Sequence, residues 1–168
     1  MTERADVRAW VGLGSNLDNP PSQLQRALLA LDKLPHTRVL RHSSLYLSAP
    51  WGIADQPAFV NAVAELRTSL EPRTLLDSLL AIERVQGRRR DGTRWGPRTL
   101  DLDLLSYADH QSSEPDLILP HPHIAERAFV LLPWAELDAG TEIPGAGVVR
   151  DLLARLDAHD CVPLDDSA

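Results

Sequence analysis

The chain of 168 residues contains very little cysteine and very little lysine. Cys161 is its only cysteine, so the sequence allows no disulfide within the chain and no zinc site built from cysteines. Lys33 is its only lysine, and no Gly-x-x-x-x-Gly-Lys-[Ser/Thr] run occurs, which excludes a P-loop. Any phosphate group must therefore be bound by arginine, a metal ion or backbone amides.

Long apolar runs and aromatic residues are also scarce. No apolar run approaches the length of a membrane span, and the first residues lack the pattern of a signal peptide, so we expect a cytoplasmic protein that does not contact membranes. The length and the 43% hydrophobic content fit a single domain over residues 1–168, with a frayed tail from 160 to 168. Four tryptophans, two tyrosines and two phenylalanines are the only aromatic residues, so their positions are informative.

Positive charge is concentrated in one segment. Residues 88–98 hold five arginines and a single acid, giving that segment a net charge of +4 in a chain whose net charge is −7. Guanidinium groups bind phosphate oxygens through two parallel hydrogen bonds. A charged run is more often a solvated loop, but the surrounding glycines and Pro97 favour a mobile loop that closes on a ligand.

Directly after this segment, leucine and aspartate alternate from Leu100 to Leu105. This period of two predicts a strand whose leucines enter the core, while Asp101 and Asp103 project together from the other face, roughly 7 Å apart. Two carboxylates with such a spacing suit Mg²⁺, which is usually held by one or two carboxylates plus substrate phosphates. The alternation alone favours a strand with an acidic solvent face, but the arginines upstream shift the interpretation to a polyphosphate–metal site.

The hydrophobic pattern predicts an α+β fold. It indicates the order strand, helix, strand, strand, helix, strand, which is a ferredoxin-like βαββαβ core with a mainly antiparallel sheet flanked by helices and with C-terminal helical additions. We expect Gly12 and Gly14 to let the chain turn tightly after the first strand. The expected strands are 7–14, 37–47, 59–66 and 100–105, and the expected helices are 21–34, 72–85, 128–137 and 148–156.

Several motifs occur in the order found in one known family. The run Arg94-Trp-Gly-Pro-Arg-Thr-Leu-Asp-Leu-Asp-Leu-Leu105 resembles the signature of the 6-hydroxymethyl-7,8-dihydropterin pyrophosphokinases of folate biosynthesis. The resemblance extends over about residues 7–138. The other matching motifs lie at residues 12–16, 44–52, 55–61, 82–88, 119–122 and 126–130.

The resemblance implies that the protein transfers a pyrophosphoryl group from ATP to the hydroxymethyl oxygen of the reduced pterin and releases AMP. It implies that Asp101 and Asp103 are catalytic and ligate two Mg²⁺ ions, and that Arg88 and Arg98 are catalytic as well. The residues that it assigns to ATP are Glu83, Arg88, Arg90, Trp95, Arg98, His121 and Arg127.

For the pterin, the resemblance implies a flat pocket between the rings of Phe59 and Phe129, with Asn61 recognising the polar edge of the heterocycle. Without the resemblance, both phenylalanines would be assigned to ordinary core packing. The remaining residues that it assigns to the pterin are Ser48, Ala49, Trp51 and Trp95. The expected partners are these small molecules alone, without nucleic acid, and we expect a monomer.

Four positions depart from the pattern of better-known members, and they concern the nucleotide side of the site: Leu80, Asp116, Pro122 and His123. Two other functions remain open. An RNA-binding module would use the arginine segment as a basic patch, although the net negative charge opposes it. A Mg²⁺-dependent nucleotide hydrolase would use the same carboxylates but would not need Asn61 or the paired phenylalanines.

Overall fold

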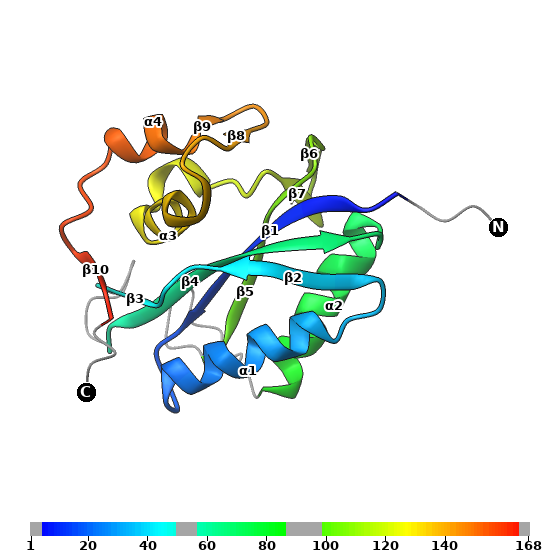
Figure 1. The fold of residues 1–168 in the computed structure, drawn as a ribbon, viewed down its shortest axis with the longest axis horizontal. Coiled ribbons are helices and arrows are strands. Elements are labelled where there is room, and N and C mark those ends of the chain that lie inside the picture. The colour runs from blue at the N-terminus through cyan, green and yellow to red at the C-terminus, as the bar shows by residue number, and fades with distance from the viewer. Residues whose placement is uncertain (1–4, 50–56, 87–98, 165–168) are drawn as a thin grey trace.

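The structure is a computed structural model that describes residues 5–49, 57–86 and 99–164. Its centre is a six-stranded sheet, and every strand pairing among the described residues is antiparallel (Figure 1). The strands of this sheet are β1 (Val7–Ser15), β2 (Thr37–His42), β3 (Tyr46–Ser48), β4 (Phe59–Thr68), β5 (Asp101–Tyr107) and β10 (Cys161–Pro163).

In the sheet, β1 lies between β4 and β5, and both β2 and β3 pair with β4 at different ends. The strand β10 continues the sheet beyond β3. Two further hairpins lie outside it: β6 (Ser112–Glu114) with β7 (Leu117–Leu119), and β8 (Glu142–Ile143) with β9 (Gly147–Val148).

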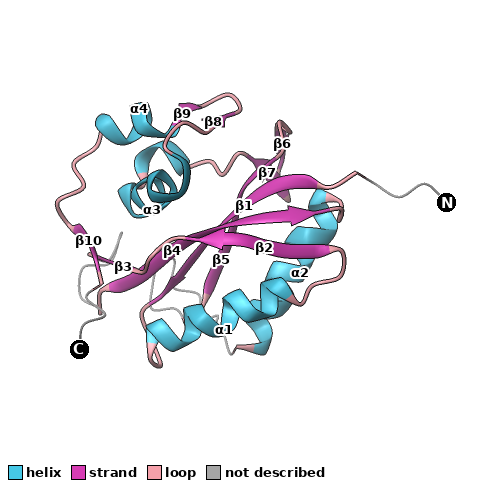
Figure 2. Ribbon diagram, in the orientation of Figure 1, coloured by secondary structure: helices cyan, strands magenta, loops and turns pink. Residues whose placement is uncertain are grey.

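Helices cover both faces of the sheet (Figure 2). The apolar faces of α1 (Pro20–Asp32) and α2 (Pro72–Val85) pack on one side, where Leu24, Leu79 and Leu102 belong to the same buried cluster. On the opposite side, α3 (Ala128–Asp138) and α4 (Val149–Ala154) close a second buried cluster, in which the rings of Trp10 and Trp134 lie 4.9 Å apart. A short 3₁₀ helix, η1 (Ile124–Glu126), precedes α3.

Three local expectations were wrong. The predicted strand 37–47 is divided into β2 and β3, because the Ser43 hydroxyl accepts the Val63 N–H and the chain leaves the sheet between them. Gly12 and Gly14 lie inside β1 and make no turn. The tail is not frayed from residue 160 onward, since Cys161–Pro163 form β10 and pair with β3. Sequence periodicity could not show these features, because each depends on a partner strand that is distant in the chain.

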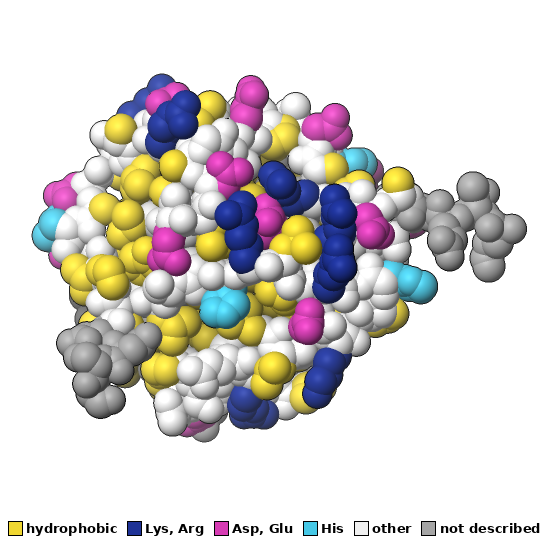
Figure 3. Space-filling model, in the orientation of Figure 1, with side chains coloured by type: hydrophobic (Ala, Val, Ile, Leu, Met, Phe, Trp, Pro, Cys, Tyr) yellow, Lys and Arg dark blue, Asp and Glu magenta, His cyan; other side chains and the backbone are white. Residues whose placement is uncertain are grey.

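The surface in Figure 3 carries interspersed acidic and basic side chains, and apolar side chains gather on the side where β3 and β10 lie. Leu47 and Val162, which are opposite each other in these two strands, are both exposed. Among the described residues, no helix combines the length and the apolar character that a membrane crossing requires.

Candidate active site

The predicted alternation along β5 is present in the structure. Leu100, Leu102 and Leu104 are buried in the cluster beneath α1 and α2, whereas Asp101 and Asp103 are partly exposed on the other face. In the sheet register, Asp101 lies opposite Gly14 and Asp103 lies opposite Gly12. Both carboxylates therefore stand beside a strand segment that has no side chains on their face.

Gly14 joins the two sides of the candidate site. It pairs with Asp101 on β5 and with Asn61 on β4, so Asn61, Gly14 and Asp101 form one row across three strands. Directly paired residues share a face, and neighbouring strands lie about 4.8 Å apart, so the row separates the Cα atoms of Asn61 and Asp101 by roughly 10 Å. The row therefore brings the residue predicted for pterin close to a residue predicted for metal.

We expect Gly14→Ala to weaken pterin binding. A Cβ atom at this position would lie 3.1 Å from Asn61 Oδ1 and 4.0 Å from a ring carbon of Phe59. Asn61 has little freedom to move, because its Nδ2 donates a hydrogen bond of 2.5 Å to Ser48 Oγ and its side chain is buried. The pterin KM should rise about fivefold to tenfold, with little change in the KM for ATP.

Steady-state kinetics with each substrate varied in turn checks this expectation. Gly140→Ala is the matched control, because the nearest atoms to its Cβ would be flexible side-chain ends of Arg150 and Asp138 at 3.5 Å. If Gly14→Ala kept the wild-type KM for pterin, the space next to Gly14 would not be part of the pterin site.

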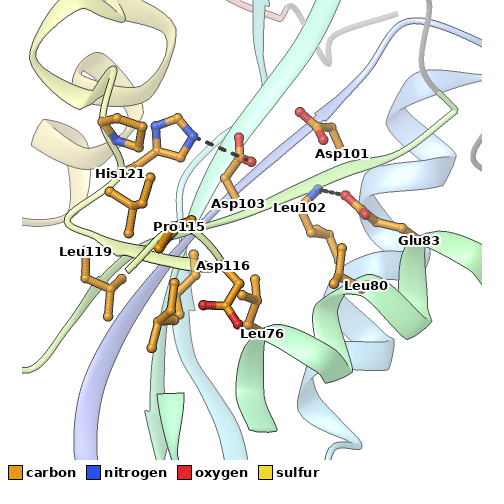
Figure 4. A pocket seen from close by; sticks show the side chains of 14 residues that line it. Leu76, Leu80, Glu83, Asp101, Leu102, Asp103, Pro115, Asp116, Leu119 and His121 are labelled. Carbon is orange, nitrogen blue, oxygen red and sulfur yellow. Dashed lines mark hydrogen bonds and ion pairs between the residues drawn. The ribbon is translucent and has the colours of Figure 1, made fainter. Parts of the chain in front are cut away.

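Asp103 lies near one proton-donating and one cationic side chain, and both come from the segment that follows the β6–β7 hairpin. Its Oδ1 lies 3.8 Å from His121 Nε2, and its Oδ2 lies 3.7 Å from a terminal nitrogen of Arg127 (Figure 4 shows the His121 contact). Arg127 is 9% exposed, and its guanidinium carbon lies 5.5 Å from the centroid of the Phe129 ring. Three residues predicted for ATP and metal are thus brought together although they come from different parts of the chain.

Burial and neighbouring positive charge favour the neutral form of His121. Burial, followed by the positive charge of Arg127 and by His123, lowers the pKa of His121 to about 4, so the imidazole is neutral at neutral pH. Its Nδ1 accepts the backbone N–H of His123 at 3.3 Å, which leaves the proton on Nε2, the nitrogen that faces Asp103. His121 is therefore a neutral hydrogen-bond donor directed toward the carboxylate pair.

Glu83 on α2 holds the edge of β5. Its carboxylate is 1% exposed, and Oε2 accepts the backbone N–H of Leu102 at 2.7 Å, between the two aspartates (Figure 4). The sequence predicts that Glu83 binds ATP. In the structure, Glu83 lines the cavity described below. It also holds the strand that carries Asp101 and Asp103 through its hydrogen bond to Leu102.

We expect the pair of variants Glu83→Gln and Glu83→Leu to isolate the contribution of the hydrogen bond to β5. Both remove the charge, but only glutamine keeps an oxygen that accepts the Leu102 N–H. An unsatisfied buried donor costs about 1–3 kcal/mol, so the free energy of unfolding should fall by about that amount in Glu83→Leu and by clearly less in Glu83→Gln. Equilibrium urea unfolding measures both values. Equal losses would show that the hydrogen bond to β5 contributes nothing measurable.

A cavity of about 260 Å³ opens between α2, β5 and the β6–β7 hairpin. Ligand pockets commonly enclose about 300–1,000 Å³, so this cavity suits part of a nucleotide. Apolar side chains of Leu76, Leu80 and Leu119 line it, and Asp101, Asp103 and His121 lie at one end (Figure 4). Three of the four positions that depart from the family pattern also line this cavity, namely Leu80, Asp116 and Pro122.

Asp116 lies in an ion pair at the mouth of this cavity. Its Oδ2 accepts a hydrogen bond of 2.6 Å from Arg73 on α2, and Arg73 also pairs with Glu114. The bond from Arg73 lowers the pKa of Asp116. The acidic residue at this departing position is therefore paired with an arginine of the chain itself.

The residues predicted to bind pterin converge from three elements. Phe59 and Asn61 lie on one face of β4, and Ser48 on β3 is opposite Phe59. Phe129 is in the first turn of α3, which packs on β4, and both phenylalanines are partly exposed. Ala49 is exposed directly after β3. Trp51 lies outside the described residues.

The predicted arginine segment also lies outside the described residues, so the placement of Arg88, Arg90, Trp95 and Arg98 stays a prediction from the sequence. Among the described residues, no group of three or more His, Cys, Asp or Glu side chains could hold a metal ion. Asp101 and Asp103, the residues predicted to bind metal, are two carboxylates on one strand. Such a pair fits Mg²⁺ that takes its remaining ligands from phosphate and water, and it does not fit an all-protein metal cage.

Comparisons with known proteins identify a family for this fold and site. The family model described as 7,8-dihydro-6-hydroxymethylpterin-pyrophosphokinase (HPPK) matches residues 10–139. The 2-amino-4-hydroxy-6-hydroxymethyldihydropteridine pyrophosphokinase of Pseudomonas aeruginosa is 52% identical over 147 residues, which cover 88% of this chain and 90% of that protein. The enzyme of the same name from Haemophilus influenzae is 40% identical over 159 residues, covering 95% and 99%.

Solved structures of Plasmodium falciparum HPPK-DHPS share the fold. The wild-type structure superposes with a TM-score of 0.69 and 13% identity, covering 92% of this chain and 45% of that chain. This chain therefore spans less than half the length of those proteins, and the likeness concerns the fold alone. By its sequence relatives, the chain belongs to the HPPK family.

Proposed function

We propose that this protein transfers a pyrophosphoryl group from ATP to the hydroxymethyl oxygen of 6-hydroxymethyl-7,8-dihydropterin and releases AMP, a step of folate biosynthesis. The relatives that support the proposal are named as pyrophosphokinases of a hydroxymethyldihydropteridine. The observation that carries the proposal is the row of Asn61, Gly14 and Asp101, because it aligns a heterocycle-binding side chain with a metal-binding carboxylate on one rigid sheet face.

In this reaction the hydroxymethyl group loses its proton to solvent, and its oxygen forms a bond to the β-phosphorus. The bond between that phosphorus and the oxygen bridging to the α-phosphorus breaks. AMP leaves with the bridging oxygen. The enzyme contributes mainly position and charge stabilisation, as is usual for phosphoryl chemistry. The strands β1, β4 and β5 hold the residues predicted to bind the two substrates in fixed positions.

Asp101 and Asp103 would hold two Mg²⁺ ions. When bound, these ions would neutralise the triphosphate oxygens and supply Lewis-acid stabilisation of the charge that develops during transfer. Arg127 and His121 lie beside Asp103. There they would donate hydrogen bonds to phosphate oxygens, Arg127 through its planar fork and His121 through Nε2. Arg88 and Arg98 add further positive charge, and Arg90 and Trp95 complete the nucleotide contacts that the sequence predicts.

The cavity between α2, β5 and the β6–β7 hairpin binds the adenosine part of ATP. Its apolar walls offer a surface for a flat base, and its inner end lies at Asp101, Asp103 and His121, where the phosphates must arrive. On the opposite side of Gly14, the pterin lies between Phe59 and Phe129, and Asn61 hydrogen-bonds to its edge. Ser48 orients Asn61 through the hydrogen bond of 2.5 Å. Ala49, Trp51 and Trp95 border this pocket.

We also propose that the core is ferredoxin-like. In chain order, the βαββαβ unit consists of β1, α1, β2, β4, α2 and β5. The neighbour order β2, β4, β1, β5 with antiparallel pairing supports this assignment. In such a unit the last strand, here β5, lies at the sheet edge, where a carboxylate pair is open to a large polyanionic substrate.

A nucleotide product assay tests the proposed function. The protein is incubated with ATP, Mg²⁺ and 6-hydroxymethyl-7,8-dihydropterin, and a parallel reaction omits the pterin. We expect AMP only when the pterin is present. Nucleotide hydrolysis without pterin would favour a Mg²⁺-dependent hydrolase, and the absence of any product from folded protein would favour the RNA-binding module.

A further inference from the structure

We propose that Glu136 is a positioning residue for the pterin site, because its carboxylate fastens the short strand β3 to helix α3. The inference rests on the proposed function, since it assigns a role within the pterin pocket. Tyr46 lies in the 44–52 motif, but the sequence analysis gave no role to Tyr46 itself or to Glu136, and neither is placed at the reacting atoms.

Three hydrogen bonds converge on the Glu136 carboxylate. Tyr46 Oη donates to Oε1 at 2.6 Å, the backbone N–H of Ser44 donates to Oε2 at 2.9 Å, and Ser44 Oγ donates to Oε2 at 3.3 Å. Tyr46 is 7% exposed, and burial together with the neighbouring carboxylate raises its pKa. The phenol therefore keeps its proton and remains a donor to Glu136.

Helix α3 is the fixed partner in this arrangement. Leu131 and Trp134 on α3 are fully buried in the second core cluster. Glu136 follows Phe129 by seven residues, which is two helical turns or about 10 Å along the axis, so both residues lie on the same side of α3. The helix thus presents a predicted pterin ring near one end and the Glu136 carboxylate near the other.

Strand β3 is the element that needs a tether. It has only three residues, and its neighbours are β4 and the equally short β10. Tyr46 lies opposite Asn61, and Ser48 accepts the hydrogen bond from Asn61 Nδ2. A shift of β3 would therefore move Ser48 and release the Asn61 amide from its orientation.

Loss of the Glu136 contacts should affect only one substrate, the pterin. Loosening β3 disturbs Ser48 and Asn61, which face the pterin, whereas Asp101, Asp103 and His121 lie on β5 and on the segment after β7. Loss of the Glu136 contacts should thus weaken pterin binding and leave ATP binding intact. A purely structural role would lower stability without changing the ratio of the two affinities.

The test measures pterin binding calorimetrically in the presence of Mg²⁺ and a non-hydrolysable ATP analogue, alongside the KM for each substrate. We expect Glu136→Ala to weaken pterin binding roughly tenfold, while the KM for ATP stays within about twofold of the wild-type value. Tyr46→Phe removes one of the three bonds and should have a smaller effect in the same direction. Glu136→Gln should recover part of the affinity, because its amide oxygen still accepts hydrogen bonds.

Asp138→Asn is the matched control, since this carboxylate is also on α3 but its ion pair, at 4.0 Å, is with Arg8 on β1. Wild-type pterin affinity in both Glu136→Ala and Tyr46→Phe would overturn the inference. So would an equal loss of ATP and pterin affinity, or a loss in Asp138→Asn as large as that in Glu136→Ala. If Glu136→Ala does not fold, Tyr46→Phe decides alone. A wild-type protein that binds no pterin would overturn the proposed function and this inference together.

Discussion

We expect Asp103→Asn to lower kcat/KM for pyrophosphoryl transfer by about 10³-fold or more while the protein stays folded. Asparagine has nearly the same shape as aspartate but lacks the charge and one of the two hard oxygen ligands. The side chain of Asp103 is 29% exposed and no hydrophobic core depends on it, so the loss falls on metal binding and chemistry. Asp101→Asn should behave in the same way, because both carboxylates project from one face of β5.

Three measurements check this expectation: the rate of AMP formation at several Mg²⁺ concentrations, the affinity for the Mg²⁺–nucleotide complex, and the midpoint of thermal unfolding. Asp109→Asn is the control, because Asp109 is an exposed residue in the turn directly after β5. Near-normal turnover of Asp103→Asn at the same Mg²⁺ concentration would contradict its assignment as a metal ligand. A large loss of kcat/KM in Asp109→Asn would show that removing a negative charge anywhere near β5 is enough to lower activity.

The second substitution is Arg127→Lys, which we expect to lower kcat/KM by about 10²-fold. Lysine keeps the positive charge, but it cannot form two parallel hydrogen bonds to phosphate oxygens and does not present a planar group to an aromatic ring. Arg127 is 9% exposed, lies 3.7 Å from Asp103, and covers the ring of Phe129 at 5.5 Å. One planar group therefore lies next to a residue predicted to bind metal and next to a residue predicted to bind pterin.

Steady-state kinetics of Arg127→Lys with both substrates measures this effect, and Arg150→Lys, at an exposed position on α4, is the control. We expect kcat to fall more than the KM for ATP rises, because the fork acts on charge that develops during transfer. A kcat/KM within about threefold of wild type would mean that positive charge alone explains the position.

The part of the site that the sequence predicted depends on local periodicity and on motif order. Alternation of leucine and aspartate is sufficient to place Leu102 in the core and Asp101 and Asp103 on the opposite face, because side chains on a strand alternate whatever its neighbours are. Hydrophobic periodicity at helical spacing likewise predicted the two amphipathic helices that pack against the sheet. Motif order then connected Asn61, Phe129 and His121 with the carboxylates, which no local pattern could have done.

The parts that sequence reasoning missed depend on contacts between distant residues. Glu83 and Glu136 are helical glutamates, a residue type common on helix surfaces, and only the folded chain shows that one accepts the Leu102 N–H and the other the Tyr46 hydroxyl. The division of the 37–47 segment reflects pairing with β4 at two places. Gly14 was expected at a turn, and only the pairing of β1 with both neighbouring strands shows that it lies between Asn61 and Asp101.

The central claim is that the nucleotide and the pterin bind on opposite sides of Gly14 and react by pyrophosphoryl transfer. This claim can be tested in a single reaction mixture. The decisive measurement is a ³¹P NMR spectrum of ATP, Mg²⁺ and 6-hydroxymethyl-7,8-dihydropterin after complete turnover by the wild-type protein. We predict the single resonance of AMP and the two coupled resonances of a pterin diphosphate ester in equal amounts, with no ADP. ADP together with a pterin monophosphate ester, or with inorganic phosphate, would contradict attack at the β-phosphorus and with it the function proposed for this site.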